Sequence, residues 1–234
     1  MKKKGFLEFT MTILLLAGAF FLPRESAQMI QSAATDPITV LIDVGHGGAD
    51  SGKVGVNGAL EKDINLQISL RLQSLLREAG INALLTRDTD KGLYQETDSN
   101  KKLADMKARI QMMTDVDADI VVSIHQNSYS KSSVSGAQVF YYTSSDQGEQ
   151  LAQAIQDGFD YALGDRNTRS IKANKDYYIL VHSPIVSVIC ECGFLSNPEE
   201  ADLLTTSDYQ QKIAQSICNG ILNYFKNSNS STLS

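Results

Sequence analysis

The chain has 234 residues, of which 42% are hydrophobic and 21% are charged, and 27 acidic against 21 basic side chains give it a formal net charge of -6. This length and composition suit one globular domain with a sizeable core. The acidic excess argues against nucleic acid as a partner, because an acidic domain gains nothing from counterion release.

The first 34 residues are typical of a targeting segment. Three lysines at 2–4 precede an uncharged, mainly apolar run at 9–22, which is short for a membrane-spanning helix but fits the centre of a signal peptide. The small residues at 32–34 offer a cleavage site, although charged residues separate them from the apolar run. We therefore expect either a cleaved signal peptide or an uncleaved membrane anchor, and both would export the domain.

Residues 35–226 alternate strand and helix signals without repeats, and residues 227–234 are expected to be a disordered tail. Apolar β-branched runs predict strands and apolar residues at helical spacing predict helices. In chain order we expect a strand at 38–45, a helix at 61–79, a strand at 81–87, a polar loop at 88–100, a helix near 103–113, strands at 119–124 and 137–142, a helix at 147–162, a strand at 185–190 and a closing helix over 213–224.

This alternation predicts a single α/β domain whose mostly parallel sheet is covered by helices on both faces. In such sheets, ligands bind at the carboxyl ends of the strands. Cys190, Cys192 and Cys218 are too few for a disulfide framework, and Cys190 and Cys192 are too close together for ordinary bridge geometry. We expect all three to be small core residues, with Cys190 and Cys192 facing away from Glu191.

Polar side chains of a catalytic kind follow three of the predicted strands. His46 follows "ITVLIDVG", His125 follows "DIVVSI", and Glu191 follows "IVSVIC". Glu61 supplies a further carboxylate at the start of the next helix, where it could equally serve as a partner for the helix dipole. Two imidazoles and one carboxylate with an open position are the pattern of a catalytic zinc site. A second carboxylate then matches the general base or acid of a metallo-amidase.

Other interpretations of the glycine-rich stretch around His46 agree less well with the sequence. The stretch lacks the G-x-G-x-x-G of a dinucleotide site and the Gly-Lys-Ser/Thr end of a phosphate-binding loop. The chain has no HExxH, the helix motif of classical zinc proteases.

Several blocks resemble the zinc-dependent N-acetylmuramoyl-L-alanine amidases. They are "DVGHGGADSG", "LEKD" at 60–63, "TRD" at 86–88, "SIHQN" at 123–127 and "ECGFLSNPEEADLL" at 191–204, in that order and within about 38–225. The resemblance implies a mixed, mostly parallel sheet flanked by helices, with the active site at the carboxyl edge of the strands. It implies His46, Glu61 and His125 as zinc ligands and Glu191 as the catalytic glutamate.

The activity implied by the resemblance is hydrolysis of the amide between the lactyl group of N-acetylmuramic acid and the L-alanine of the stem peptide in peptidoglycan. A short N-terminal segment before a bare domain is most similar to the sporulation amidases. Such enzymes act in spore cortex maturation, on the route to the muramic δ-lactam. An exported protein is implied, membrane-anchored or secreted, in the cell envelope or the forespore intermembrane space, and an activating protein partner stays open. The alternatives are a metallopeptidase acting on stem-peptide bonds and a non-catalytic wall-binding relative.

Finer roles are predicted for five further residues. Asn127 would contact substrate or support a zinc ligand, unless it only makes a turn. Asp43 would orient a ligand, or be a satisfied polar group of the core. Arg169 would meet a carboxylate or the glycan of the substrate. Arg109 is expected to form a structural ion pair, and His182 is expected to lie away from the site, ahead of its strand.

Overall fold

The computed structural model describes residues 37–231, and the predicted targeting segment lies outside these residues. From Ile38 onward the chain forms one compact unit. Within 37–231, no helix combines the length and the apolar character that crossing a bilayer would need.

The strands form one mixed sheet in the order β2-β1-β3-β6-β4-β5. All neighbouring strands run parallel except β4 and β6, which are antiparallel. The predicted α/β fold with a mostly parallel sheet is therefore confirmed. The strands are β1 (Thr39–Val44), β2 (Asn82–Leu85), β3 (Ile120–Asn127), β4 (Gln138–Tyr142), β5 (Lys172–Asn174) and β6 (Val186–Phe194).

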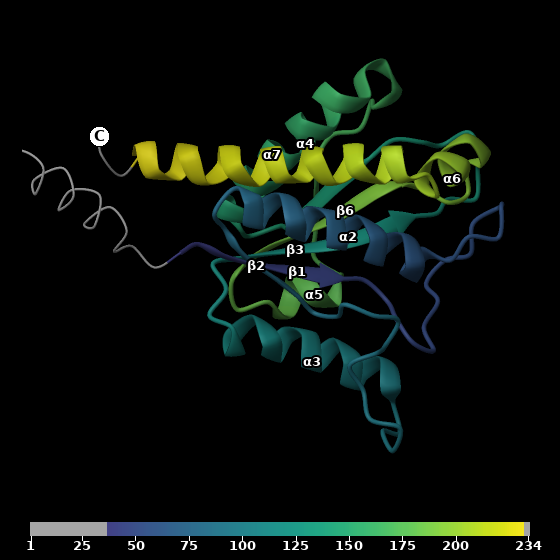
Figure 1. Cartoon of the computed structure of the whole chain (residues 1–234), viewed down its shortest axis with the longest axis horizontal. Helices are drawn as coiled ribbons and strands as arrows, with labels where there is room; N and C mark the ends of the chain where they lie inside the picture. Colours follow the sequence, from purple (N-terminus) through teal and green to yellow (C-terminus); the bar gives the residue numbers. More distant parts are fainter. Residues whose placement is uncertain (1–36, 232–234) are drawn as a thin grey trace, which may run out of the picture. The chain divides into compact units, whose positions relative to one another are not determined.

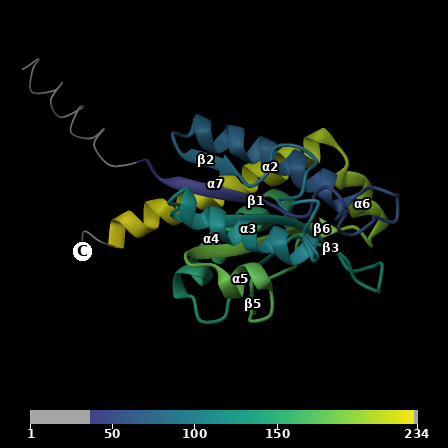
Figure 2. The ribbon, with the colours of Figure 1, turned by 90° about the horizontal axis from the view of Figure 1, so that it is seen from below.

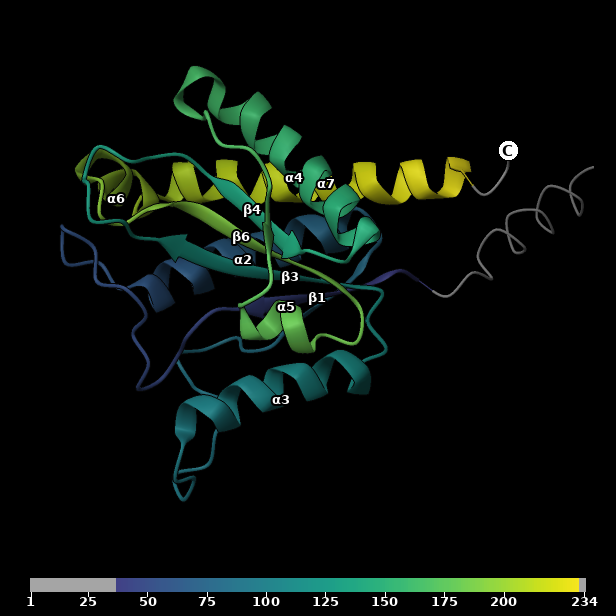
Figure 3. The ribbon, with the colours of Figure 1, turned by 180° about the vertical axis from the view of Figure 1, so that it is seen from behind.

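Helices cover both faces of this sheet (Figure 1). One face packs against α2 (Glu61–Glu78), α4 (Asp146–Leu163) and α7 (Ser207–Ser231), which share the larger apolar core with the strands. The other face packs against α3 (Lys101–Asp115) and α5 (Tyr178–His182), around a smaller core. Seen from below, α3 and α5 lie in front of the sheet (Figure 2), and from behind they lie on the side opposite α7 (Figure 3).

Local capping chemistry explains where several helices begin. The side chain of Asn100 accepts a hydrogen bond from the Leu103 amide at the start of α3, and Ser145 accepts one from the Gly148 amide at the start of α4. Asn197 caps α6 (Pro198–Leu204), whose first residue is a proline. The first backbone amides of a helix have no partner inside the helix, and these cap side chains accept hydrogen bonds from them.

The structure differs from the sequence-based expectation in three ways. His125 lies inside β3 and Glu191 lies inside β6, because both strands continue past their apolar runs. Residues 227–231, expected as tail, continue α7, since no glycine or proline stops a helix that is already formed. The short elements β5, α5, α6 and the 3-10 turn Gly164–Arg166 were not predicted, because each is too short to show a periodic pattern.

Candidate active site

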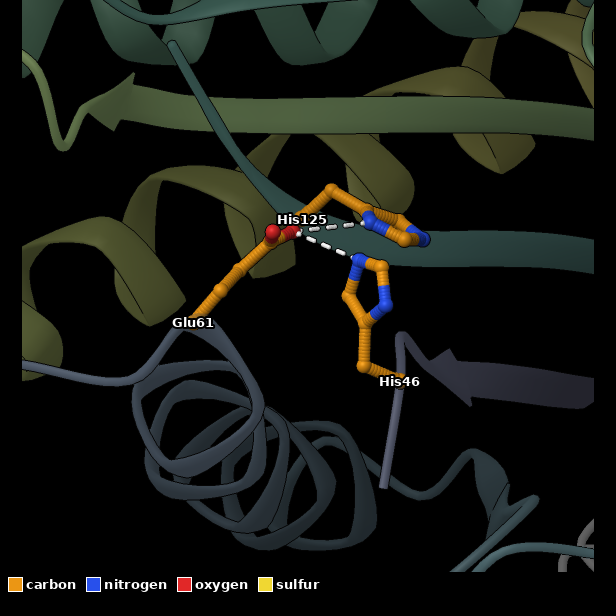
Figure 4. A group of neighbouring side chains, drawn as sticks. All are labelled: His46, Glu61 and His125. Atoms are coloured by element: carbon orange, nitrogen blue, oxygen red, sulfur yellow. Dashed lines mark hydrogen bonds and ion pairs between the residues drawn. The ribbon is translucent and has the colours of Figure 1, made fainter. Parts of the chain in front are cut away.

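Three side chains from three elements converge at the carboxyl edge of the sheet (Figure 4). His46 lies just after β1, Glu61 begins α2, and His125 lies near the end of β3. The His46 Nε2 and His125 Nδ1 atoms lie 3.2 Å and 3.0 Å from the same Glu61 oxygen, Oε1. The carboxyl ends of parallel strands lie at the same edge of the sheet, and residues up to 79 positions apart in the chain therefore meet there.

The Glu61 carboxylate is the buried centre of this group, only 2% exposed. Its Oε1 also accepts the Gln126 amide at 3.0 Å, and its Oε2 accepts the Lys53 amide at 2.8 Å. Burial alone would raise the pKa of Glu61, but hydrogen bonds from His125 and His46 hold it well below its usual range. The carboxylate is therefore ionised and fixed in place from both of its oxygens.

The second ring nitrogen of His46 is held by a carboxylate. Nδ1 lies 2.9 Å from Asp50 Oδ2, four residues along the same loop. Burial would lower the pKa of His46, but Glu61 and Asp50 together raise it. A carboxylate behind a ligating imidazole fixes its tautomer and ring orientation, as is common in metal sites.

These donors fit a divalent metal ion. One ligand atom from each of His46, Glu61 and His125 lies within 4.8 Å of the other two. Two imidazole nitrogens and one carboxylate oxygen are the donor set of a catalytic site that keeps a position open for water. The support from Asp50 and the backbone amides supplies the outer contacts such a site needs.

Glu191 lies beside this group on the neighbouring strand, where its residue is paired in register with His125. Its side chain is buried, and its Oε2 has no hydrogen-bond partner among the described residues. Burial raises the pKa of Glu191 to about 7, with opposing contributions from His125 and Glu61. A carboxyl group in this state can take up or release a proton near neutral pH.

A cavity of about 630 Å³ opens in front of these residues, on the sheet face that carries α3 and α5. Its volume is in the range of small-molecule sites, and its walls are aromatic and aliphatic as well as charged. Beyond the site residues, the charged part of its lining is Lys101, Lys102 and Asp105, and the aromatic and aliphatic part includes Tyr94, Met106, Tyr177, Tyr178 and Ile179.

Gly45 makes the close packing of the site feasible. A Cβ atom at this position would lie 2.4 Å from His125 Cε1 and 2.5 Å from its Nε2. Any side chain here would displace the imidazole, so the strand needs a glycine directly before His46. Gly52 serves the same purpose, since a Cβ atom there would lie 2.5 Å from Glu61 Oε2.

Asp43 lines the same cavity but belongs to a network that holds the strands. Its carboxylate accepts hydrogen bonds from Arg109, Ser123 and Thr86. Burial would raise the pKa of Asp43, yet the Arg109 guanidinium and the Ser123 hydroxyl lower it overall. Arg109 also pairs with Asp105, so the structural ion pair expected for this arginine is confirmed.

Two other residues predicted to meet substrate lie outside the lining of this cavity. The Asn127 side chain accepts the Ser128 amide at 2.8 Å, which is the turn role left open by the sequence. Arg169 donates to the Ser135 carbonyl at 2.9 Å and lies over the Phe194 ring. Their contacts with substrate stay predictions. His182 is exposed and is absent from the cavity lining, although its ring stacks on Tyr178, which does line the cavity.

Sequence reasoning missed the residues that support the ligands. Asp50 could have been found, because a carboxylate four residues after a histidine in one loop is within reach of its ring. Arg87 donates to the backbone around His46, and Asn65 donates to the Gly45 carbonyl. Arg87 lies in the quoted block "TRD", but the sequence does not show which groups Arg87 or Asn65 contacts, since side chain to backbone bonds between distant segments depend on the fold.

Comparison with known proteins identifies similar chains across most of this length. Residues 40–223 match the family model described as N-acetylmuramoyl-L-alanine amidase. The germination-specific N-acetylmuramoyl-L-alanine amidase of Bacillus subtilis is 38% identical over 189 residues, which cover 80% of this chain and 79% of that protein.

Solved structures give the same result. The CwlD amidase from Clostridioides difficile, solved in complex with the GerS lipoprotein, superposes with a TM-score of 0.78 at 38% identity, over 81% of this chain and 98% of that one. The amidase AmiC2 of Nostoc punctiforme has a TM-score of 0.72 at 33% identity, over 82% and 99% of the two chains.

Proposed function

Because the chain belongs to the N-acetylmuramoyl-L-alanine amidase family, we propose that its His46, Glu61 and His125 hold a zinc ion and that Glu191 is its catalytic glutamate. The enzyme is an amidase of the cell wall. Its substrate is peptidoglycan, which lies outside the cytoplasm. The bond cleaved joins the lactyl group of N-acetylmuramic acid to the L-alanine of the stem peptide.

The observation that carries the metal proposal is the convergence of three candidate ligand atoms beside the buried Glu191, whose Oε2 has no hydrogen-bond partner within residues 37–231. Nitrogen and oxygen donors in this number favour zinc over the oxygen-rich sites of magnesium and calcium. A structural domain would have no use for four polar groups placed together in this way, since burying them is costly.

When bound, zinc would lower the pKa of a water molecule and polarise the scissile carbonyl. Glu191 takes a proton from the attacking water and passes it to the departing L-alanine nitrogen. In the metal-free site, burial raises the pKa of Glu191 to about 7, and the positive charge of a bound zinc ion would lower it. The amide bond breaks as the water oxygen bonds to the carbonyl carbon of the lactyl group, leaving a free carboxylate and a free amine.

We extend the proposal to spore cortex peptidoglycan. Support comes from the 38% identity to a germination-specific amidase and from the similar fold of CwlD. Removal of the stem peptide there would precede formation of the muramic δ-lactam. The solved complex of CwlD with a lipoprotein supports a protein partner for this chain as well. Anchoring or secretion through residues 1–34 stays a prediction.

Mass spectrometry of digested peptidoglycan tests this function. The full chain loaded with zinc is incubated with purified cortex and with vegetative peptidoglycan, and metal content is measured on the same sample. We expect intact stem peptides with a free L-alanine amine, unsubstituted muramic acid and about one zinc per chain. The variant His125→Ala should lose the zinc and the products together, because a ligand is missing.

Two outcomes would contradict the proposal. Peptides cut within the stem would indicate a metallopeptidase. A protein without zinc and without products would indicate a non-catalytic wall-binding relative. Equal cleavage of cortex and vegetative material would remove the cortex assignment but keep the amidase.

A further inference from the structure

The backbone of His46 is held in an unfavourable conformation by two arginines. Its φ of 61° lies in the left-handed region, which residues other than glycine rarely adopt. The His46 carbonyl accepts Arg87 Nε at 2.7 Å and Arg109 Nη2 at 2.8 Å. The direction in which this imidazole points therefore depends on contacts made by its own carbonyl.

Arg87 also contacts the chain beside the second ligand. Its Nη2 donates to the Gly45 carbonyl at 3.0 Å and to the Lys62 carbonyl at 2.8 Å. Lys62 follows Glu61 directly in the first turn of α2. One buried guanidinium thus bridges the segment that carries His46 and the segment that carries Glu61.

All the hydrogen bonds that the described structure gives to Arg87 end on backbone carbonyls. Arg109 differs, because it also pairs with the carboxylates of Asp43 and Asp105. Gly47 allows Arg87 this close approach, since a Cβ atom there would lie 2.8 Å from its Nε. The planar fork of a guanidinium can meet carbonyls in several directions at once, which the point charge of lysine cannot.

We propose that Arg87 is a positioning residue of the metal centre, which sets the separation between the His46 and Glu61 ligand atoms and thereby the affinity for the metal. This inference rests on the zinc site of the proposed function. Arg87 touches neither the metal ligands' donor atoms nor the cavity, so it acts only through the backbone of the two segments.

Zinc affinity measured in Arg87→Lys tests the inference. The full chain and the variant compete for Zn²⁺ with a chromophoric chelator, and the thermal unfolding of both metal-free proteins is recorded. We expect zinc binding to weaken by about 10- to 100-fold, as for other residues that support a ligand. With Co²⁺ in place of zinc, the visible absorption spectrum should change, because the ligand geometry changes.

The matched control is Phe159→Leu, a buried change in α4 within the core on the other face of the sheet. It should lower the unfolding temperature but leave zinc affinity within about twofold, because additive effects are expected of distant sites. If Arg87→Lys cannot be obtained folded, Arg87→Gln replaces it in the same assays with the same expectation.

Zinc affinity of wild-type strength in a folded Arg87 variant would overturn the inference and leave the proposed function intact. An equal loss of affinity in Phe159→Leu would also overturn it, because affinity would then follow stability. A wild-type protein that binds no zinc would overturn the proposed function first, and the inference with it.

Discussion

The two faces of the sheet are built from alternate residues of the same strands, and both have an apolar core, yet only one of them also carries the candidate site. On the face covered by α2, α4 and α7, β3 and β6 present apolar side chains and free thiols that are fully buried. On the face covered by α3 and α5, the same strands present Ser123, His125 and Glu191 to a cavity. A shift of one residue in register would exchange the two faces.

The difference shows how a buried polar site can be made rigid. Each site residue of β3 and β6 is flanked along the strand by side chains of the larger core, such as Ile124 before His125 and Cys190 and Cys192 around Glu191. A close-packed core keeps those strands in place. The geometry of the site residues is therefore fixed by packing on the opposite face, which takes no part in the proposed chemistry.

The largest effect on activity should come from a change at Glu191 that leaves His125, its partner in register, intact. In Glu191→Gln we expect kcat to fall about 10³-fold, because the proton transfers are lost. Zinc content should stay at the wild-type level, since Glu191 is not among the proposed ligands. Turnover on purified peptidoglycan and metal analysis of the same sample measure both.

The matched control is Cys192→Ala, on the same strand and the opposite face. It should keep kcat and lower the free energy of unfolding by about 1 kcal/mol through lost packing. Near-normal turnover in Glu191→Gln would contradict the proposal that residues of the cavity face perform the chemistry while the opposite face supplies packing.

A smaller effect is expected from Asp43, a polar residue on the cavity face that holds strands together. Its pKa is lowered by Arg109 and Ser123 against the effect of burial. A group with a lowered folded pKa stabilises the protein above its unfolded pKa, near 3.9, and loses that contribution as pH falls through the folded value. We therefore expect Asp43→Asn to lower the free energy of unfolding by about 3 kcal/mol at pH 7.

Urea denaturation of both proteins between pH 7 and pH 2.5 measures this difference. The difference in unfolding free energy between wild type and Asp43→Asn should be constant above about pH 5 and should become smaller below about pH 4. A gap that is the same at all these values would mean that the ionised carboxylate of Asp43 does not stabilise the fold.

The smallest effect should come from Ile124→Val, a change beside His125 on the apolar face. Removing one buried methylene group should cost about 1 kcal/mol of unfolding free energy. Zinc affinity and kcat should stay within about twofold of wild type. A larger change in zinc affinity, measured by chelator competition, would mean that packing on this face tunes the metal centre directly.

The sequence was sufficient for the main elements and for the core of the site. Long apolar runs located β1, β3 and β6, and the rule for parallel strands brought His46, His125 and Glu191 to one edge. The assignment of Glu61 as a ligand needed the resemblance to a family, because a glutamate in the first turn of a helix is common without any function.

Other features could not be predicted because they depend on tertiary contacts. The end of β3 is polar and Glu191 interrupts the apolar run of β6, so the apolar pattern stopped before His125 and Glu191, which in fact lie within their strands. The side chain of Arg87 meets the Thr89 carbonyl and also carbonyls from residues 44 to 62, and the sequence around Arg87 does not indicate these distant partners. Arg169 is predicted to meet a carboxylate or the glycan of the substrate, and the fold places it against the Ser135 carbonyl and the Phe194 ring.

The register pair of His125 and Glu191 has a consequence for the order in which activity arises during synthesis. His46 and Glu61 are made early and lie near each other in the chain, but they lack His125 until β3 pairs with β1. Glu191 joins only when β6, made last of the three, docks against β3. Such pairing between distant segments forms late, because loop closure must come first. A nascent or partly folded chain therefore lacks the complete proposed site, and hydrolysis would begin only after β6 has paired with β3.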